Sequence, residues 1–75
     1  MIKVYSKPLC IQCTMTKNFL SQHDIPFEEI NVLADEAALE LIKSKGCFSL
    51  PVVTTNDSFD GAWCGFRIDK LEELV

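Results

Sequence analysis

Hydrophobic and polar positions alternate at the start of the chain, where Ile2 and Val4 flank the polar Lys3. This period of two predicts a strand over residues 2–6. The strand is predicted to end in a loop that contains Pro8, because proline cannot donate a hydrogen bond to a neighbouring strand. Apolar side chains then recur four positions apart, which predicts a helix over residues 11–23.

Five further segments follow along the chain. Partial alternation predicts a second strand over residues 27–32. A stripe of apolar residues, with acidic residues at its start and lysines at its end, predicts a helix between Asp35 and Gly46. The remaining pattern predicts a strand over 50–55, a turn at Asn56-Asp57, a short strand between Ser58 and Trp63, and a last helix over 66–75.

The predicted order is therefore β-α-β-α-β-β-α. The first two strands are joined through a helix, so we expect them to be parallel with a right-handed crossover, and we expect the last two to form an antiparallel hairpin. This order predicts an α/β protein with the minimal thioredoxin fold, a four-stranded mixed sheet with helices on both faces. At 75 residues, we expect one domain spanning residues 1–75.

Composition narrows the classes of function. The chain is 48% hydrophobic, which is enough for a core, and its net charge of −4 comes without a cluster of Lys or Arg. That balance argues against a nucleic-acid partner. The first residues carry no long apolar stretch and no cleavage-site pattern, so we expect no secretion signal and no membrane span. We expect a cytoplasmic monomer.

The pair Cys10 and Cys13 stands where the first predicted strand gives way to a helix. A CxxC run at such a junction is typical of a thioredoxin-like redox site. The free N–H groups at a helix start favour thiolate, so Cys10 is the expected nucleophile. Such a position can bring the pKa of a thiol from about 8.5 to roughly 7 or lower. Cys13 lies one turn further on and is the expected resolving thiol. Lys7 could add positive charge, or could simply be solvated.

Four cysteines in a small chain also fit other interpretations. A secreted disulfide framework is disfavoured by the missing signal and the aliphatic core. A zinc site would need two more ligands, and no second CxxC or CxxH accompanies Cys47 and Cys64, so no metal site is expected. We expect Cys47 to be a buried or inert thiol. We expect Cys64 to have a packing role, although a turn position would let it oxidise.

Three motifs together resemble the NrdH-redoxin family over nearly the whole chain. They are Cys10-Ile11-Gln12-Cys13, Leu50-Pro51-Val52-Val53 and the run from Trp63 to Asp69. Glutaredoxins proper usually carry Pro-Tyr between the cysteines, and a Gly-Gly with an acidic pair at the last turn. This chain departs from the NrdH-redoxin pattern at Cys64, where a small hydroxyl residue is usual, and in a longer stretch before Trp63.

The resemblance implies roles for particular residues. Cys10 attacks, Cys13 resolves, and Pro51 is a cis proline facing the active site, whereas the local pattern alone favours an ordinary trans proline at a strand start. The exposed backbone before that proline pairs with an incoming chain. The residues expected to bind a partner are Lys7, Leu9, Ile11, Gln12, Leu50, Pro51, Trp63, Gly65, Phe66 and Arg67, with an apolar surface around Leu9, Ile11, Pro51 and Phe66.

The resemblance also implies partners. Electrons would come from NADPH through thioredoxin reductase and pass to the large subunit of a class Ib ribonucleotide reductase, with no bound cofactor. Glutathione should bind weakly, because Phe66 and Arg67 cannot pair with its charged amine and Asp69 lies further into the helix. A glutathione-dependent glutaredoxin and a metal-binding module remain the alternatives.

Overall fold

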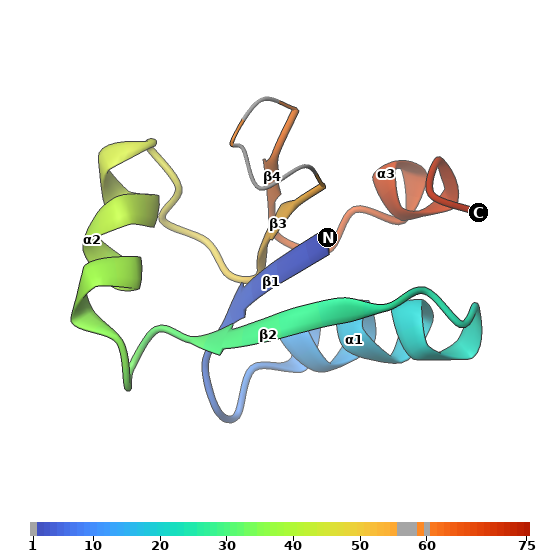
Figure 1. The fold of residues 1–75 in the computed structure, drawn as a ribbon, viewed down its shortest axis with the longest axis horizontal. Coiled ribbons are helices and arrows are strands. Elements are labelled where there is room, and N and C mark those ends of the chain that lie inside the picture. Colours follow the sequence, from blue (N-terminus) through green and yellow to red (C-terminus); the bar gives the residue numbers. More distant parts are fainter. Residues whose placement is uncertain (1, 56–58, 60) are drawn as a thin grey trace.

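A computed structural model describes residues 2–55, 59 and 61–75. Within these residues the chain follows the predicted order of strands and helices, coloured from blue to red in Figure 1. The strands are β1 (Ile2–Ser6), β2 (Phe27–Asn31), β3 (Val52–Thr54) and β4 (Trp63–Cys64), and the helices are α1 (Ile11–Gln22), α2 (Glu36–Ser44) and α3 (Ile68–Glu72). The turn predicted at Asn56-Asp57 lies outside the described residues.

The four strands form one mixed sheet in the order β2-β1-β3-β4. Strand β1 runs parallel to β2, with Ile2 opposite Phe27, and antiparallel to β3, with Val4 opposite Val53. Strands β3 and β4 are antiparallel, as predicted for the hairpin. The central strand β1 therefore delivers the chain to the cysteine pair at the start of α1.

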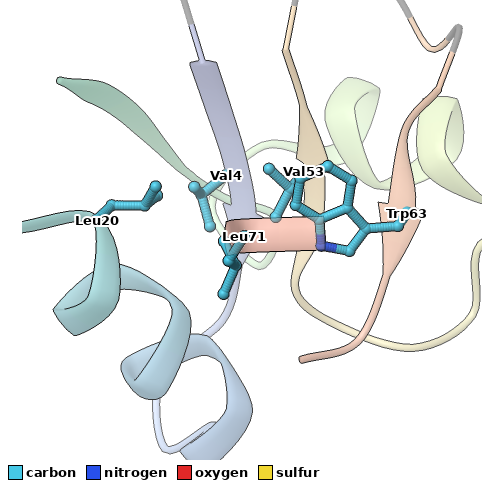
Figure 2. Close-up of a cluster of buried hydrophobic side chains, with 5 residues drawn as sticks. All are labelled: Val4, Leu20, Val53, Trp63 and Leu71. Atoms are coloured by element: carbon cyan, nitrogen blue, oxygen red, sulfur yellow. The ribbon is translucent and has the colours of Figure 1, made fainter. Parts of the chain in front are cut away.

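Hydrophobic side chains pack on both faces of this sheet. On one face Val4, Val53 and Trp63 meet Leu20 of α1 and Leu71 of α3, as Figure 2 shows. On the other face Tyr5, Val52 and Val32 meet Ala38 and Ile42 of α2. Neighbouring strand residues thus point to opposite faces. The predicted minimal thioredoxin fold, with helices on both faces, is confirmed.

The ends of the helices follow from local chemistry. Helix α2 begins after Asp35, whose Oδ1 accepts a hydrogen bond of 3.1 Å from the backbone N–H of Ala38. It ends where Gly46 adopts a φ of +80°, and the N–H of Cys47 then donates to the carbonyl of Ile42 at 3.0 Å. This cap fixes the backbone of Cys47 directly after the helix.

Three predicted segments are corrected. The fourth strand lies at Trp63–Cys64 rather than before Trp63, because Gly61 has a left-handed φ of +76° that a strand does not accept. The last helix begins at Ile68, since Arg67 is still extended. The third strand is shorter than predicted, Val52–Thr54, and starts after Pro51, which has no N–H to donate.

No helix among the described residues is long and apolar enough to cross a membrane.

Candidate redox site

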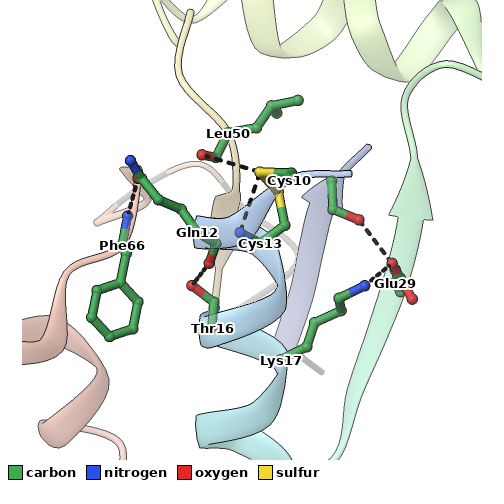
Figure 3. Close-up of a disulfide and its surroundings, with 9 residues drawn as sticks. Cys10, Gln12, Cys13, Thr16, Lys17, Glu29, Leu50 and Phe66 are labelled. Carbon is green, nitrogen blue, oxygen red and sulfur yellow. Dashed lines mark hydrogen bonds and ion pairs between the residues drawn. A yellow bond between two sulfur atoms is a disulfide. The ribbon is translucent and has the colours of Figure 1, made fainter. Parts of the chain in front are cut away.

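A disulfide joins Cys10 and Cys13 at the N-terminal end of α1, shown in Figure 3. Their Cα atoms lie 5.2 Å apart, within the range that a disulfide spans. The loop after β1 turns through Leu9, which has a left-handed φ of 58°, and brings Cys10 to the capping position of the helix. The predicted pair is therefore in place for disulfide exchange.

The two cysteines differ in access. The Cys10 side chain is partly exposed, whereas Cys13 is only 1% exposed. The Cys10 Sγ accepts a hydrogen bond of 3.3 Å from the backbone N–H of Cys13, and the first turn of α1 holds no acidic residue. A negative charge on that sulfur would face the N–H groups at the start of the helix, which stabilise it. No carboxylate in that turn would oppose the charge. An incoming sulfur can reach Cys10 but not Cys13.

The Leu50–Pro51 peptide bond is cis, which the family resemblance implied and the local sequence pattern did not. The carbonyl oxygen of Leu50 lies 3.9 Å from the Cys10 Sγ (Figure 3). A disulfide sulfur has no proton to donate, so this contact becomes a hydrogen bond only when Cys10 is a thiol. The segment before β3 thus stands directly against the exposed sulfur.

An open groove of about 420 Å³ lies beside Cys10 and is lined in part by Leu9, Ile11 and Phe48. These three side chains are strongly exposed, Phe48 at 79%. The expectation that Pro51 contributes to this apolar surface is wrong, because its ring is fully buried. Phe48 contributes to the apolar surface instead, and this role was not predicted. The sequence did contain a signal for it, an aromatic residue between a helix-ending glycine and the Leu-Pro motif. Lys7, Gln12 and Leu50 also line the groove, as expected of residues near the pair.

A third segment, between β4 and α3, closes the other side of the site. The Gln12 Oε1 accepts a hydrogen bond of 3.0 Å from the backbone N–H of Phe66, and the N–H of Gly65 donates to the Pro51 carbonyl at 2.7 Å. The structure thus brings together residues from the three predicted motifs. Trp63 is a correction: predicted to bind a partner, it is only 7% exposed and packs in the core (Figure 2).

Arg67 and Asp69 form an ion pair at the start of α3. The Arg67 Nε and Nη2 donate to the two carboxylate oxygens of Asp69 at 3.1 and 2.9 Å. The hydrogen bonds from Arg67 lower the pKa of Asp69, and the pKa of Arg67 is raised by the same contact. Both groups face solvent, so the pair contributes little stability. Arg67 nevertheless occupies both carboxylate oxygens of Asp69, the acidic side chain nearest this turn.

Glu29, in β2, links its own strand to β1 and α1. Its Oε2 accepts from the Lys17 Nζ at 2.6 Å and from the buried Ser6 hydroxyl at 2.9 Å. These hydrogen bonds, that of Lys17 first, lower the pKa of Glu29, although partial burial opposes the shift. The contacts tie α1 to β1 and β2. Sequence patterns gave no signal for this cluster because its members come from separate segments.

Comparisons with known proteins agree with this geometry. A family model described as Glutaredoxin matches residues 2–59. The chain belongs to the glutaredoxin family. Within that family it is 40% identical to the glutaredoxin-like protein NrdH of Lactococcus lactis subsp. lactis (strain IL1403) over 75 residues, all of both chains. It is 36% identical to NrdH of Escherichia coli (strain K12) over 73 residues, 97% of this chain and 86% of that protein.

Solved structures show the same kinship. The NrdH-redoxin from Escherichia coli superposes with a TM-score of 0.90 at 35% identity, covering 99% of this chain and 93% of that one. The resemblance to NrdH-redoxins is therefore confirmed, and the chain is an NrdH-like redox protein of the glutaredoxin family with Cys10 and Cys13 as its CxxC pair.

The other two cysteines of this glutaredoxin-family chain are bonded to each other. Cys47, after α2, and Cys64, in β4, form a disulfide with Cα atoms 6.0 Å apart. The expectation of an inert thiol at Cys47 is wrong, since the residue is bonded to Cys64. Cys64 does pack against the hydrophobic cluster around Val52, as expected, and it is also oxidised. The two residues are distant in sequence, and the sheet brings them together where β4 passes the end of α2.

The metal-binding alternative needs at least three ligands in one place. Among residues 2–55, 59 and 61–75, no group of three His, Cys, Asp or Glu side chains is arranged to hold a metal ion. Metal analysis of the purified protein remains the test of that alternative.

Proposed function

We propose that this NrdH-like protein is a dithiol–disulfide oxidoreductase that carries electrons between protein partners. The observation that carries the proposal is the asymmetry of the pair at the start of α1. Cys10 is partly exposed and its Sγ accepts a hydrogen bond from the Cys13 N–H, whereas Cys13 is buried one turn inside the helix. Such a pair attacks with the first sulfur and resolves with the second.

In the reduced protein, the Cys10 thiolate attacks one sulfur of a target disulfide. A bond forms between the Cys10 Sγ and that sulfur, and the other target sulfur leaves as a thiolate. Cys13 then loses its proton and attacks the Cys10 Sγ, which releases the second target thiolate. The target gains two electrons, and the Cys10–Cys13 disulfide described above is the oxidised product.

The groove beside Cys10 supports a protein substrate. Leu9, Ile11 and Phe48 offer an exposed apolar surface, and the Leu50 carbonyl stands next to the reacting sulfur. A backbone strand of the target can pair beside this segment, which holds its disulfide in reach of Cys10. The polar neighbours Lys7 and Gln12 would complete the contact.

We propose thioredoxin reductase as the electron source, with NADPH as the ultimate donor, and the large subunit of a class Ib ribonucleotide reductase as the target. The protein would act in the cytoplasm as a monomer, without a bound cofactor. Two observations support this assignment over a glutathione-dependent one. The Escherichia coli neighbour is described as a glutaredoxin-like protein with a thioredoxin-like activity profile. Here Arg67 occupies both carboxylate oxygens of Asp69, which leaves them poorly placed for the glutathione amine.

A trapping experiment tests the assigned roles. Reduced Cys13→Ser protein is mixed with the oxidised large subunit of a class Ib ribonucleotide reductase, and covalent complexes are separated and mapped by mass spectrometry. We expect a stable mixed disulfide through Cys10, because the resolving thiol is gone. The matched Cys10→Ser protein should give no mixed disulfide through Cys13, which is buried. Equal trapping by the two variants would overturn the assignment of the nucleophile.

A further inference from the structure

The Cys47–Cys64 disulfide lies outside the Cys10–Cys13 pair, yet it bears on the same groove. Both partners have fixed backbones: the Cys47 N–H donates to the Ile42 carbonyl at 3.0 Å, and Cys64 pairs with Val52 in the sheet. Their Cα separation of 6.0 Å lies within the range that a disulfide spans. The fold therefore brings the two cysteines, 17 positions apart in the sequence, within bonding reach of each other.

The disulfide is one of two ties on the segment that faces Cys10. This segment, Phe48–Leu50, runs from the end of α2 towards β3 (Figure 1). At its start, Cys47 is bonded to Cys64. At its end, the Pro51 carbonyl accepts a hydrogen bond of 2.7 Å from the N–H of Gly65. Both ends are thus fastened to consecutive residues, Cys64 and Gly65, at the end of β4.

Between the two ties lie the parts that a partner would meet. The Phe48 ring projects into solvent at the groove, and the Leu50 carbonyl lies 3.9 Å from the Cys10 Sγ. Opening the disulfide removes the covalent tie at the start of the segment. The cap at the end of α2 and the packing of Cys47 and Leu50 against the cluster around Val52 remain. A looser start would let Phe48, whose side chain is strongly exposed, change position.

We propose that Cys47 and Cys64 are a second, reversible dithiol–disulfide couple whose oxidation orders the Phe48–Leu50 segment. Both side chains are partly exposed, so a thiolate can reach the bond. Disulfides in reducing compartments are mostly transient or redox-sensing, which fits the cytoplasmic setting proposed above. The consequence for partner docking rests on the proposed function; the existence of the couple does not.

The chemistry is thiol–disulfide exchange with a small disulfide, written RSSR, as the oxidant. The thiolate of one cysteine attacks RSSR and expels one RS⁻. The thiolate of the second cysteine attacks the mixed disulfide and expels the other RS⁻. Two thiols of the protein lose two electrons and two protons, and RSSR becomes two RSH. A dithiol such as dithiothreitol reverses the reaction.

The first test isolates this couple in a Cys10→Ser/Cys13→Ser protein. The protein is equilibrated in mixtures of reduced and oxidised glutathione, its thiols are alkylated, and intact mass is recorded. We expect two alkylated thiols in reducing mixtures and none in oxidising ones. Thiols that stay alkylatable in every mixture would overturn the proposal, and so would a disulfide that survives excess dithiothreitol in the native protein.

The second test follows amide hydrogen exchange in the same variant with the couple oxidised or reduced. We expect exchange at Phe48, Ser49 and Leu50 to be about tenfold faster or more in the reduced form, because local opening becomes easier. Exchange within α1, which the disulfide does not touch, is the internal control. Equal exchange at the three residues in both forms would overturn the ordering role.

The third test measures reduction of insulin disulfides by a Cys47→Ser/Cys64→Ser protein that retains Cys10 and Cys13. Relative to the unsubstituted protein, we expect KM for insulin to rise about threefold to tenfold and kcat to stay within about twofold. The reason is that insulin must now order the Phe48–Leu50 segment when it binds. Unchanged KM would overturn the link to docking. No turnover even by the unsubstituted protein would count against the proposed function instead, while the first two tests would still decide the couple.

Discussion

The Gln12 Oε1 accepts a hydrogen bond of 3.0 Å from the backbone N–H of Phe66, which joins the cysteine-bearing end of α1 to the turn before α3 (Figure 3). Gln12 lies between the two cysteines, and Phe66 is 54 residues further along the chain. The Gln12 side chain, inside the CxxC motif, therefore positions the backbone of a turn that borders the site. Its removal should affect partner binding more than bond exchange.

For Gln12→Ala we expect a loss of about 0.5–1.5 kcal/mol in the free energy of unfolding, the usual net contribution of one hydrogen bond. The KM for a protein disulfide should rise while kcat changes little, because Cys10 and Cys13 are untouched. Thermal unfolding and steady-state insulin reduction measure the two effects. Gln22→Ala, at the other end of α1, is the matched control and should leave KM unchanged. A fall in kcat alone would contradict the positioning role.

Gly65→Ala should destabilise the protein by about 1–2 kcal/mol from backbone conformation alone, since its φ is +84°. An added Cβ would also lie 3.3 Å from the Gln12 Oε1. Gly61→Ala is the control, with a similar φ of +76° and nothing within 4 Å of its Cβ. We expect the larger loss at Gly65, measured by denaturant unfolding, and expect the excess to shrink in a Gln12→Ala background. Equal losses in all backgrounds would mean that the Gln12 contact is irrelevant.

The fold was predictable because its signals are local. Strand alternation around Val4, the acidic start of α2 and the stop at Gly46 each report the structure of their own segment. The CxxC pair was found for the same reason: its position at a strand-to-helix junction is visible along the chain. The strand at Trp63–Cys64 was misplaced by a few residues because Gly61 obscures where the pairing begins.

Apart from Phe48, the features that sequence reasoning missed depend on which segments meet. Cys47 and Cys64 are 17 positions apart, and only the sheet shows that they face each other. Trp63 has a large aromatic side chain of the kind that often docks a partner, yet this side chain points to the core face of β4. The cis bond before Pro51 followed from family resemblance, not from the residues around it.

The Glu29 contacts predict a pH dependence of stability. The hydrogen bonds from Lys17 and Ser6 lower the folded-state pKa of Glu29 below its ordinary value of 4.5. Its contribution is therefore fully present above that value and is lost as the pH falls through the lowered pKa. At neutral pH, Glu29→Gln should lower the free energy of unfolding by at most about 1 kcal/mol, because the side chain is 45% exposed and screened.

Denaturant unfolding between neutral and acid pH measures this effect. The difference between Glu29→Gln and the unsubstituted protein should close below pH 4.5, once the carboxylate is protonated in both states. Glu28→Gln, its neighbour on β2, removes the same charge without touching Lys17 or Ser6 and is the control. A difference that persists unchanged into acid would show that the carboxylate is not the stabilising form.

A coupled assay identifies the source of electrons for the Cys10–Cys13 disulfide. The oxidised protein is supplied with NADPH and thioredoxin reductase in one cuvette, and with NADPH, glutathione and glutathione reductase in the other. NADPH oxidation is followed while insulin is reduced. We expect fast turnover with thioredoxin reductase and little with glutathione. Fast turnover with glutathione alone would contradict this expectation and would make this chain a glutathione-dependent glutaredoxin despite the Arg67–Asp69 pair.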